Sequence, residues 1–283
     1  MEIKKVGVVG CGTMGSGITQ VCAQSGYQVV VSEINDELLT KGLALINSAL
    51  TKSVDKGKIY QQDKETMLNR IKGTTSTKDF YNCDLVIEAA NENMELKKKI
   101  FAELDKICPE HAILASNTSC LSITDMAMAT NRPDRVLGLH FFNPAPVMKL
   151  LEIIKTTATS EKTLKASRDF GNSLGKTVVI AQDTPGFIVN RLMVPFLLNA
   201  ICMLEAGVAT REDIDTAGNL GLGHPMGPLT LADFIGLDVV LAIADAMFEK
   251  FKEPQYAPPV LLKKMVATGW LGRKTGKGFY EYK

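Results

Sequence analysis

The sequence lacks an apolar run long enough to cross a membrane. Its longest apolar stretch, from Leu192 to Leu204, is interrupted by Pro195 and Asn199 and is shorter than the roughly 20 residues of a membrane helix. Nor do we expect a secretion signal, because residues 7–12 include three glycines where a signal has an apolar segment that favours a helix. We therefore predict a cytoplasmic protein without a targeting segment.

An excess of charge of either sign is also missing. The 32 lysines and arginines and the 31 aspartates and glutamates leave a formal net charge of +1, so no general field would attract nucleic acid or an anionic membrane. None of the six cysteines belongs to a Cys-x-x-Cys pair. We predict reduced thiols in a reducing compartment, and we expect neither a disulfide framework nor a metal site.

A glycine-rich turn is the first feature that indicates a function. Gly10, Gly12 and Gly15 lie between an apolar run at 6–9 and a helical segment, and a second apolar run follows at 28–32. In such a strand–helix–strand unit the glycines permit a tight turn and close approach of the backbone to a pyrophosphate, which the helix start binds. We predict a dinucleotide site here, with contacts from Gly10, Gly12, Thr13, Met14 and Gly15.

Glu33 follows the second apolar run and suggests which dinucleotide binds. It lies near the position, about 20 residues beyond the turn, where a carboxylate accepts hydrogen bonds from the ribose of NAD. The same carboxylate would repel the 2′-phosphate of NADP, and residues 34–36 contain no arginine to attract it. We predict NAD as the cofactor, and the alternative is a solvated glutamate at a strand end.

Strand-like and helical segments alternate over the first two thirds of the chain. Further strands are predicted at 84–88, 112–115, 136–141, 150–154 and 177–180, with a helical region over 36–71 and a charged helix over 93–107. This alternation predicts an α/β fold with a doubly wound sheet of the Rossmann type.

The pattern changes at Pro185 and Gly186. Beyond them every segment is predicted to be helical, at 187–206, 211–220, 228–251 and 257–268. Because Pro185 extends the residue before it and Gly186 adds a flexible joint, we predict a dinucleotide-binding domain over 1–183 and an all-α domain over 184–283. The first helix of this second domain is apolar on nearly all sides, so a subunit interface could cover part of it.

His140 lies at the carboxyl end of the strand at 136–141, where ligands bind in open α/β sheets. Oxidation of an alcohol by a nicotinamide needs a base for the hydroxyl proton, and histidine exchanges protons near neutral pH. Glu152 lies in the apolar run 150–154, where a carboxylate is costly unless it is paired. We predict an acid–base pair in which the carboxylate fixes the imidazole tautomer. The alternatives are a structural histidine and an outward-facing glutamate.

Other polar residues near the predicted ligand site allow two interpretations each. Ser116, Asn117, Thr118 and Ser119 follow a strand end and could bind a substrate oxygen or cap the next helix. Asn190, in the first turn of the helix after the boundary, could contact substrate or be a capping or buried amide. Their spacing alone does not decide between these roles.

Taken together, these motifs resemble the L-3-hydroxyacyl-CoA dehydrogenase family. The resemblance spans the whole chain and rests on the glycine turn and on the segments 116–119, 138–144, 183–191 and 272–280. A chain of this length, without a fused hydratase, is most similar to the bacterial members that act on 3-hydroxybutyryl-CoA. The resemblance implies an NAD-dependent oxidoreductase of the cytoplasm that interconverts (S)-3-hydroxybutyryl-CoA and acetoacetyl-CoA.

The resemblance also implies roles for individual residues. His140 would be the general base in oxidation and, as imidazolium, the acid in reduction, with Glu152 as its orienting partner. Ser119 and Asn190 would hydrogen-bond the reacting oxygen of the substrate. Cofactor contacts are implied for Glu92, Lys97, Asn143 and Lys274. The helical domain would close over the acyl chain and form the interface of a homodimer or a higher homo-oligomer.

Lysines after the second strand are candidates for binding coenzyme A. Lys52, Lys56 and Lys58 lie in the helical region that resembles the family's protruding helical pair, and their ammonium groups could meet phosphates as point charges. A solvated helix face is the alternative for each of them.

Two other functions are weighed against this one. A dehydrogenase for another 3-hydroxy acid or a longer 3-hydroxyacyl-CoA is the first, although the small 3-hydroxyacid enzymes resemble a design with a catalytic lysine on the boundary helix. No lysine occurs from 177 to 249. The second is a non-enzymatic, crystallin-like relative, which the intact set of predicted catalytic residues argues against.

Overall fold

The computed structural model describes residues 2–282 and divides into two compact units between Asp183 and Thr184. The strands of unit 1 are β1 (Lys5–Val9), β2 (Gln28–Ser32), β3 (Ile71–Thr74), β4 (Leu85–Glu88), β5 (Ile113–Ser116), β6 (Val136–Phe141), β7 (Leu150–Lys155) and β8 (Thr177–Gln182). They form one sheet in the order β3-β2-β1-β4-β5-β6-β7-β8, in which only β6 and β7 pair antiparallel. Strands β3 to β6 have the doubly wound order, which confirms the predicted fold class.

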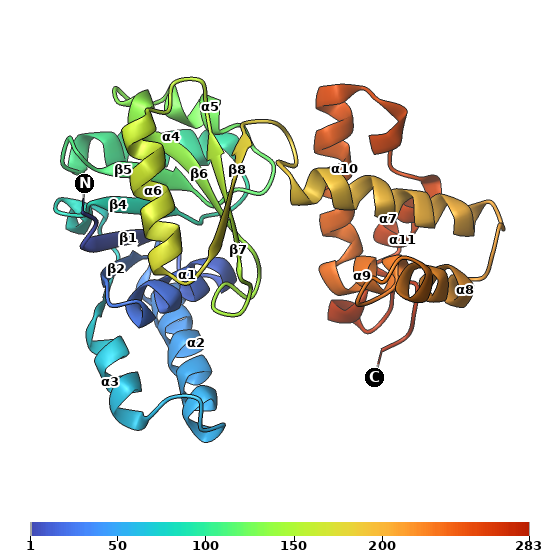
Figure 1. Ribbon diagram of the computed structural model, residues 1–283, viewed down its shortest axis with the longest axis horizontal. Helices are drawn as coiled ribbons and strands as arrows, with labels where there is room; N and C mark the ends of the chain where they lie inside the picture. Colours follow the sequence, from blue (N-terminus) through green and yellow to red (C-terminus); the bar gives the residue numbers. More distant parts are fainter. Residues whose placement is uncertain (1, 283) are drawn as a thin grey trace. The chain divides into compact units, whose positions relative to one another are not determined.

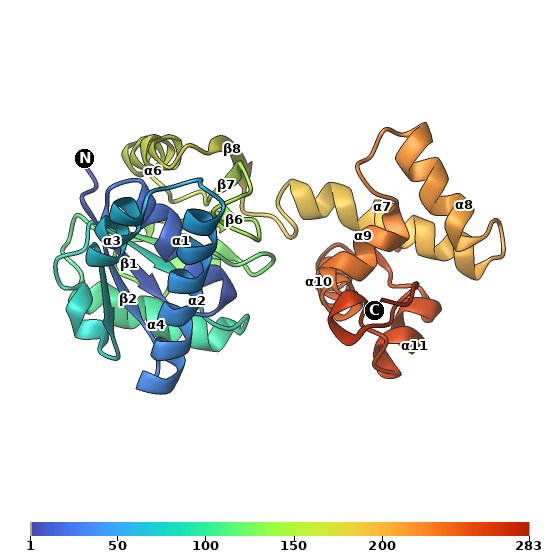
Figure 2. The same ribbon diagram turned by 90° about the horizontal axis from the view of Figure 1, so that it is seen from below.

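Helices flank the sheet of unit 1 (Figures 1 and 2). They are α1 (Thr13–Gln24), α2 (Asp36–Asp55), α3 (Gln61–Asn69), α4 (Met94–Ile107), α5 (Ile123–Ala127) and α6 (Glu161–Ser173), with short 3₁₀ turns η1 (Thr77–Phe80) and η2 (Pro133–Arg135). Helices α2 and α3 extend away from the sheet as a pair (Figure 1). The pair therefore forms an arm beside the glycine turn rather than a cover for the sheet.

The core of unit 1 explains why the apolar runs become strands. Val6, Val8, Val29 and Val31 are at most 1% exposed and pack with Ile18 of α1. Strands of a parallel sheet are buried on both faces, which suits continuous β-branched runs. Each fully buried side chain of this size stabilises the fold by about 1.5–3 kcal/mol relative to an exposed one, so the sheet is a rigid support for the loops at its carboxyl ends.

The helical region predicted over 36–71 differs from the structure in two ways. It is two helices, because the chain turns after Asp55 and Gly57 has a φ of +65°, a left-handed conformation that ends helices and favours glycine. The residues that follow α3 form the edge strand β3, which pairs with β2. This strand has little apolar signal of its own and forms through its neighbour.

Unit 2 is helical, which confirms the predicted all-α class of this part. Its elements are α7 (Val189–Glu205), α8 (Arg211–Thr216), the π-helical turn η3 (Ala217–Gly221), α9 (Pro228–Ile235), α10 (Leu237–Phe251), η4 (Pro254–Tyr256), α11 (Val260–Ala267) and η5 (Arg273–Thr275). The single helix predicted over 228–251 is wrong: Gly236, with a φ of +104°, separates α9 from α10. Within residues 2–282, no helix is both long and apolar enough to span a bilayer.

Candidate active site

His140 and Glu152 face each other across the antiparallel strand pair. His140 lies near the carboxyl end of β6, and Glu152 is its register partner on β7. The imidazole Nδ1 lies 2.6 Å from Glu152 Oε2, and the two residues are 4% and 0% exposed. Because a buried carboxylate needs such a partner, the alternative of an outward-facing Glu152 is wrong.

The hydrogen bonds of the imidazole define which nitrogen carries the proton. A carboxylate can only accept, so the Nδ1–H of neutral His140 donates to Glu152 and leaves a lone pair on Nε2. Ser119 Oγ lies 3.1 Å from Nε2. Nε2 therefore lies beside the hydroxyl group of another predicted site residue, in the position that a general base requires.

The loop after β5 brings Ser119 to this place. Asn117 Oδ1 accepts the backbone N–H of Phe141 at 2.9 Å, which fastens the loop beside the end of β6. Helix α5 is capped by the side chain of Ser122. The alternative that residues 116–119 cap this helix is therefore wrong.

A buried ion pair adjoins the same loop. Glu88, at the end of β4, and Lys97, on α4, have side chains that are 0% and 1% exposed, and Lys97 Nζ lies 2.7 Å from Glu88 Oε1. The ammonium is also 3.4 Å from Glu92 Oε2. Ser116 Oγ donates to Glu88 Oε2 at 2.6 Å, and the N–H of Ser119 donates to Glu92 Oε1 at 3.1 Å. The expected cofactor residues Glu92 and Lys97 thus belong to a network that reaches Ser119.

The glycine turn leaves room for phosphates. A Cβ on Gly15 would lie 1.8 Å from the carbonyl oxygen of Gly10, whereas a Cβ on Gly12 would meet no atom within 4 Å. Gly12 is the N-cap residue of α1, so no capping side chain accepts a hydrogen bond from the first N–H groups of this helix. Glu33 Oε1 accepts the N–H of Cys11 at 2.7 Å, so its carboxylate lies at the turn. An open helix start beside a carboxylate fits the pyrophosphate and ribose of NAD.

A cavity of about 610 Å³ lies among α1, α2 and the loop between β6 and β7. Thr13 of the first turn of α1, Asn143 and Lys52 are predicted site residues that line it, and Lys58 lines it as well. Met14, the next residue of α1, and Lys56, at the end of α2, are not among the lining residues. The cavity therefore connects the start of α1 with the lysines of the helical arm.

Lys176 anchors the loop between β6 and β7. Its ammonium donates to the carbonyl oxygens of Ala145 and Met148, at 2.5 and 2.7 Å. Lys176 is 8% exposed, and burial lowers the pKa of its ammonium. Because two carbonyl groups share one buried donor, this wall of the cavity has a defined shape.

Two thiols near these groups are not nucleophiles. Burial raises the pKa of Cys11, in the glycine turn, to about 12, and the carboxylate of Glu33 acts in the same direction. Burial and the neighbouring Glu92 likewise raise the pKa of Cys120 to about 12. Since reactive cysteines are thiolates near neutral pH, neither thiol is suited to covalent catalysis.

Two predicted site residues belong to unit 2. Asn190 is buried in the first turn of α7. The side chain of Lys274 is exposed, and its ammonium lies 2.6 Å from Asp238 Oδ2. Their contacts with substrate and cofactor stay predictions.

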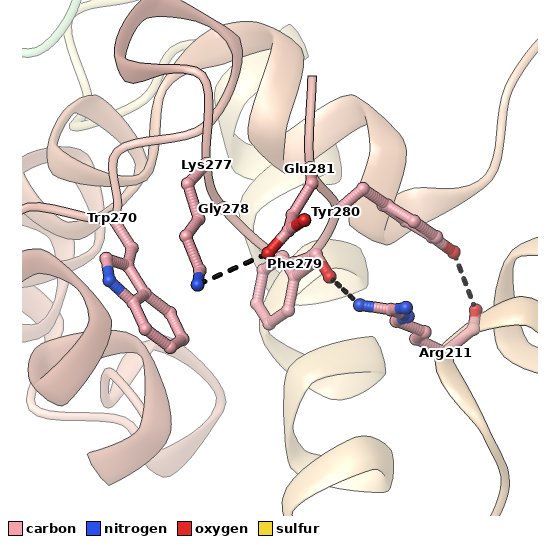
Figure 3. A pocket seen from close by; sticks show the side chains of 7 residues that line it. All are labelled: Arg211, Trp270, Lys277, Gly278, Phe279, Tyr280 and Glu281. Atoms are coloured by element: carbon pink, nitrogen blue, oxygen red, sulfur yellow. Dashed lines mark hydrogen bonds and ion pairs between the residues drawn. The ribbon is translucent and has the colours of Figure 1, made fainter. Parts of the chain in front are cut away.

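Unit 2 has a cavity of its own, of about 630 Å³ (Figure 3). Lys277 Nζ lies 4.1 Å from the centre of the Trp270 ring and 3.4 Å from the carboxylate of Glu281. Arg211 donates to the carbonyl oxygen of Phe279 at 2.5 Å. Both cations therefore have partners within the cavity, and the predicted site residues are not among those that line it.

Two residues of the site were not predicted. Glu88 ends an apolar strand and shows the same signal as Glu152, a carboxylate among buried residues, so the pattern could have identified it. Lys176 directly precedes β8, and nothing in its sequence neighbourhood distinguishes it from a solvated lysine.

Comparisons with known proteins cover the whole chain. The family model described as "3-hydroxyacyl-CoA dehydrogenase, NAD binding domain" matches residues 5–184, and the model described as "3-hydroxyacyl-CoA dehydrogenase, C-terminal domain" matches residues 186–282. A 3-hydroxybutyryl-CoA dehydrogenase of Mycobacterium tuberculosis is 49% identical over 282 residues, which cover 99% of both chains.

Two solved structures are similar over all of this chain and all of their own. They are FadB2 of M. tuberculosis, with 49% identity and a TM-score of 0.98, and the (S)-3-hydroxybutyryl-CoA dehydrogenase PaaH1 of Ralstonia eutropha, with 47% identity and a TM-score of 0.97.

Proposed function

The chain belongs to the 3-hydroxyacyl-CoA dehydrogenase family, and we propose that it interconverts (S)-3-hydroxybutyryl-CoA and acetoacetyl-CoA with NAD. The observation that carries the proposal is the buried His140–Glu152 pair at the carboxyl end of β6, with Ser119 at Nε2. The 3-hydroxybutyryl-CoA dehydrogenases among its relatives support the substrate.

The catalytic work of the chain is proton transfer at Nε2. In oxidation, His140 accepts the proton of the 3-hydroxyl group, and in reduction the imidazolium returns it to the carbonyl oxygen. Glu152 holds Nδ1–H and stabilises the imidazolium that forms. Ser119 donates a hydrogen bond to the reacting oxygen, and we assign the same role to Asn190.

NAD, when bound, supplies the acceptor for the hydride that leaves C3 of the substrate. The turn at Gly10, Gly12 and Gly15 and the first residues of α1, Thr13 and Met14, would hold its pyrophosphate. The remaining residues that we assign to the cofactor are Glu33, Glu92, Lys97, Asn143 and Lys274. Equal catalytic efficiency with NADPH and NADH would contradict the role of Glu33 in excluding a 2′-phosphate.

The helical arm provides the charge for coenzyme A. Lys52 and Lys58 line the cavity beside α1, and a phosphate there would meet two ammonium groups. Lys56 is the third lysine that we assign to coenzyme A, and it is not among the residues that line the cavity.

We also propose a homo-oligomer that assembles through unit 2, in a cytoplasmic protein. Leu192 and Met203 of α7 are 72% and 41% exposed, and Leu220 and Leu222 follow at 77% and 63%. Exposed apolar side chains mark a protein interface where they form a contiguous patch, so these four residues are our candidates for the contact. The six free thiols fit a reducing compartment.

The proposal is tested by NADH oxidation with a panel of 3-keto compounds. We expect acetoacetyl-CoA to be reduced with a higher kcat/KM than free acetoacetate or longer 3-ketoacyl-CoA thioesters. Activity with the free acid and none with the thioester would contradict the assigned substrate. A higher kcat/KM with longer thioesters would assign the enzyme to longer chains, and no activity with any of them would favour the crystallin-like alternative.

A further inference from the structure

A buried ammonium that lies between two carboxylates has one partner acid, Glu88, to which the proposed function gives no role. Lys97 is buried with Glu88 at 2.7 Å and also lies 3.4 Å from the side chain of Glu92, which is 40% exposed. A single lysine does not need two acids for neutrality. Neutralising the buried charge of Lys97 therefore does not by itself account for both carboxylates.

Both carboxylates hold the loop that carries Ser119. Glu88 accepts the hydroxyl of Ser116 at 2.6 Å, and Ser116 Oγ in turn accepts the N–H of Thr118 at 3.2 Å. Glu92 accepts the N–H of Ser119 at 3.1 Å and the hydroxyl of Thr118. The loop is thus fixed at its start by Glu88 and at its end by Glu92.

We propose that Glu88 is a positioning residue for catalysis, which holds Ser119 Oγ at His140 Nε2 through Ser116 on one side and Lys97 on the other. Without its carboxylate, Lys97 would pair fully with Glu92 and compete with the hydrogen bonds that Glu92 accepts from the loop. The distance between Ser119 Oγ and His140 Nε2, which is 3.1 Å, would then change. The inference rests on the proposed function only for the meaning of its kinetic measurements.

Glu88→Gln is the direct test, and Ser116→Ala is the second variant, since it removes one link to the loop and leaves the ion pair intact. Asp105→Asn is the matched control. Asp105, on α4, is a buried acid like Glu88, but it is paired with Arg132 at 2.7 Å and does not contact the loop. All three variants are first compared by thermal unfolding, because the loss of a buried acid or of a buried hydrogen bond lowers stability wherever it lies.

The first measurement needs no substrate. The chain has three histidines, so ¹⁵N NMR of the imidazoles reports on each of them separately. We expect Glu88→Gln and Ser116→Ala to displace the Nε2 resonance of His140 and to leave those of His111 and His224 unchanged, while Asp105→Asn displaces none. An unmoved His140 resonance in both loop variants would overturn the inference.

The second measurement is a double-mutant cycle on kcat with acetoacetyl-CoA. Glu88→Gln should lower kcat by about tenfold or more, as expected for a misplaced catalytic group, and should cause no further loss in a Ser119→Ala background. Losses that multiply would show that Glu88 acts elsewhere. If the unaltered enzyme has no activity, the proposed function fails. The His140 resonance still shows whether Glu88 positions Ser119 at Nε2.

Discussion

At the scale of residues, the sequence predicted which residue pairs with His140, but not the strand pairing that brings the two side chains together. A carboxylate within the apolar strand at Glu152 needs a buried partner, and a histidine at a strand end is a candidate for it. The direction of β7 is not encoded locally, so the register pairing of the two residues could not be predicted. Lys97 was a candidate only through the family resemblance, because a lysine in a charged helix looks like any solvated one and its burial beside Glu88 could not be predicted.

Glu152→Gln tests the orienting role of the carboxylate. The amide can donate to Nδ1 and thereby favours the tautomer with the proton on Nε2, which has no lone pair for the substrate proton. We expect kcat to fall by about 100-fold or more, measured by NADH oxidation, whereas Glu161→Gln on the surface leaves kcat unchanged. The loss should not multiply with that of His140→Gln, since residues that act as a unit are not additive.

At the scale of elements, apolar patterning identified the central strands and most helices of the chain. It failed at β3, an edge strand of mixed composition that pairs with β2, and at the ends of α2 and α9, where glycines with positive φ end the helices. The sequence did not predict the shape of the loop between β6 and β7, although Asn143 of this loop was an expected cofactor contact. That shape depends on Lys176, which lies almost thirty residues away along the chain.

Lys176→Met tests whether this loop shapes the substrate cavity. Removing the ammonium leaves two carbonyl groups without their buried donor, which costs about 1–3 kcal/mol in free energy of unfolding for each group that stays unsatisfied. We expect urea unfolding to show this loss and the KM for acetoacetyl-CoA to rise several-fold. Lys165→Met, at an exposed ion pair of α6, is the matched control. An unchanged KM in the Lys176 variant would show that the shape of this loop does not affect substrate binding.

At the scale of the whole molecule, the chain consists of two units with separate cores. The change from alternating to purely helical patterning predicted the fold class of each unit, because the period of apolar residues differs between strands and helices. The attachment of the C-terminal segment to unit 2 could not be predicted. It depends on Asp233, which is 1% exposed and accepts the N–H groups of Phe279 and Tyr280 at 2.9 Å.

Asp233→Asn tests the independence of the two units. The amide nitrogen cannot accept a hydrogen bond, so one backbone N–H loses its acceptor and unit 2 should lose about 1–3 kcal/mol of stability. Thermal unfolding should show a lower midpoint for unit 2 and an unchanged midpoint for unit 1. Asp213→Asn on the surface of α8 is the control. A variant that loses stability in both units together would contradict separate cores.

The most direct test of the central claim compares His140→Gln with the unaltered enzyme. With acetoacetyl-CoA and NADH, the account predicts that kcat of the variant falls by about 10²–10⁴-fold, the contribution of a general acid–base group, while the dissociation constant for NADH stays within about twofold. Near-normal turnover in His140→Gln would contradict the account, because proton transfer at Nε2 would then not be the chemistry of this site.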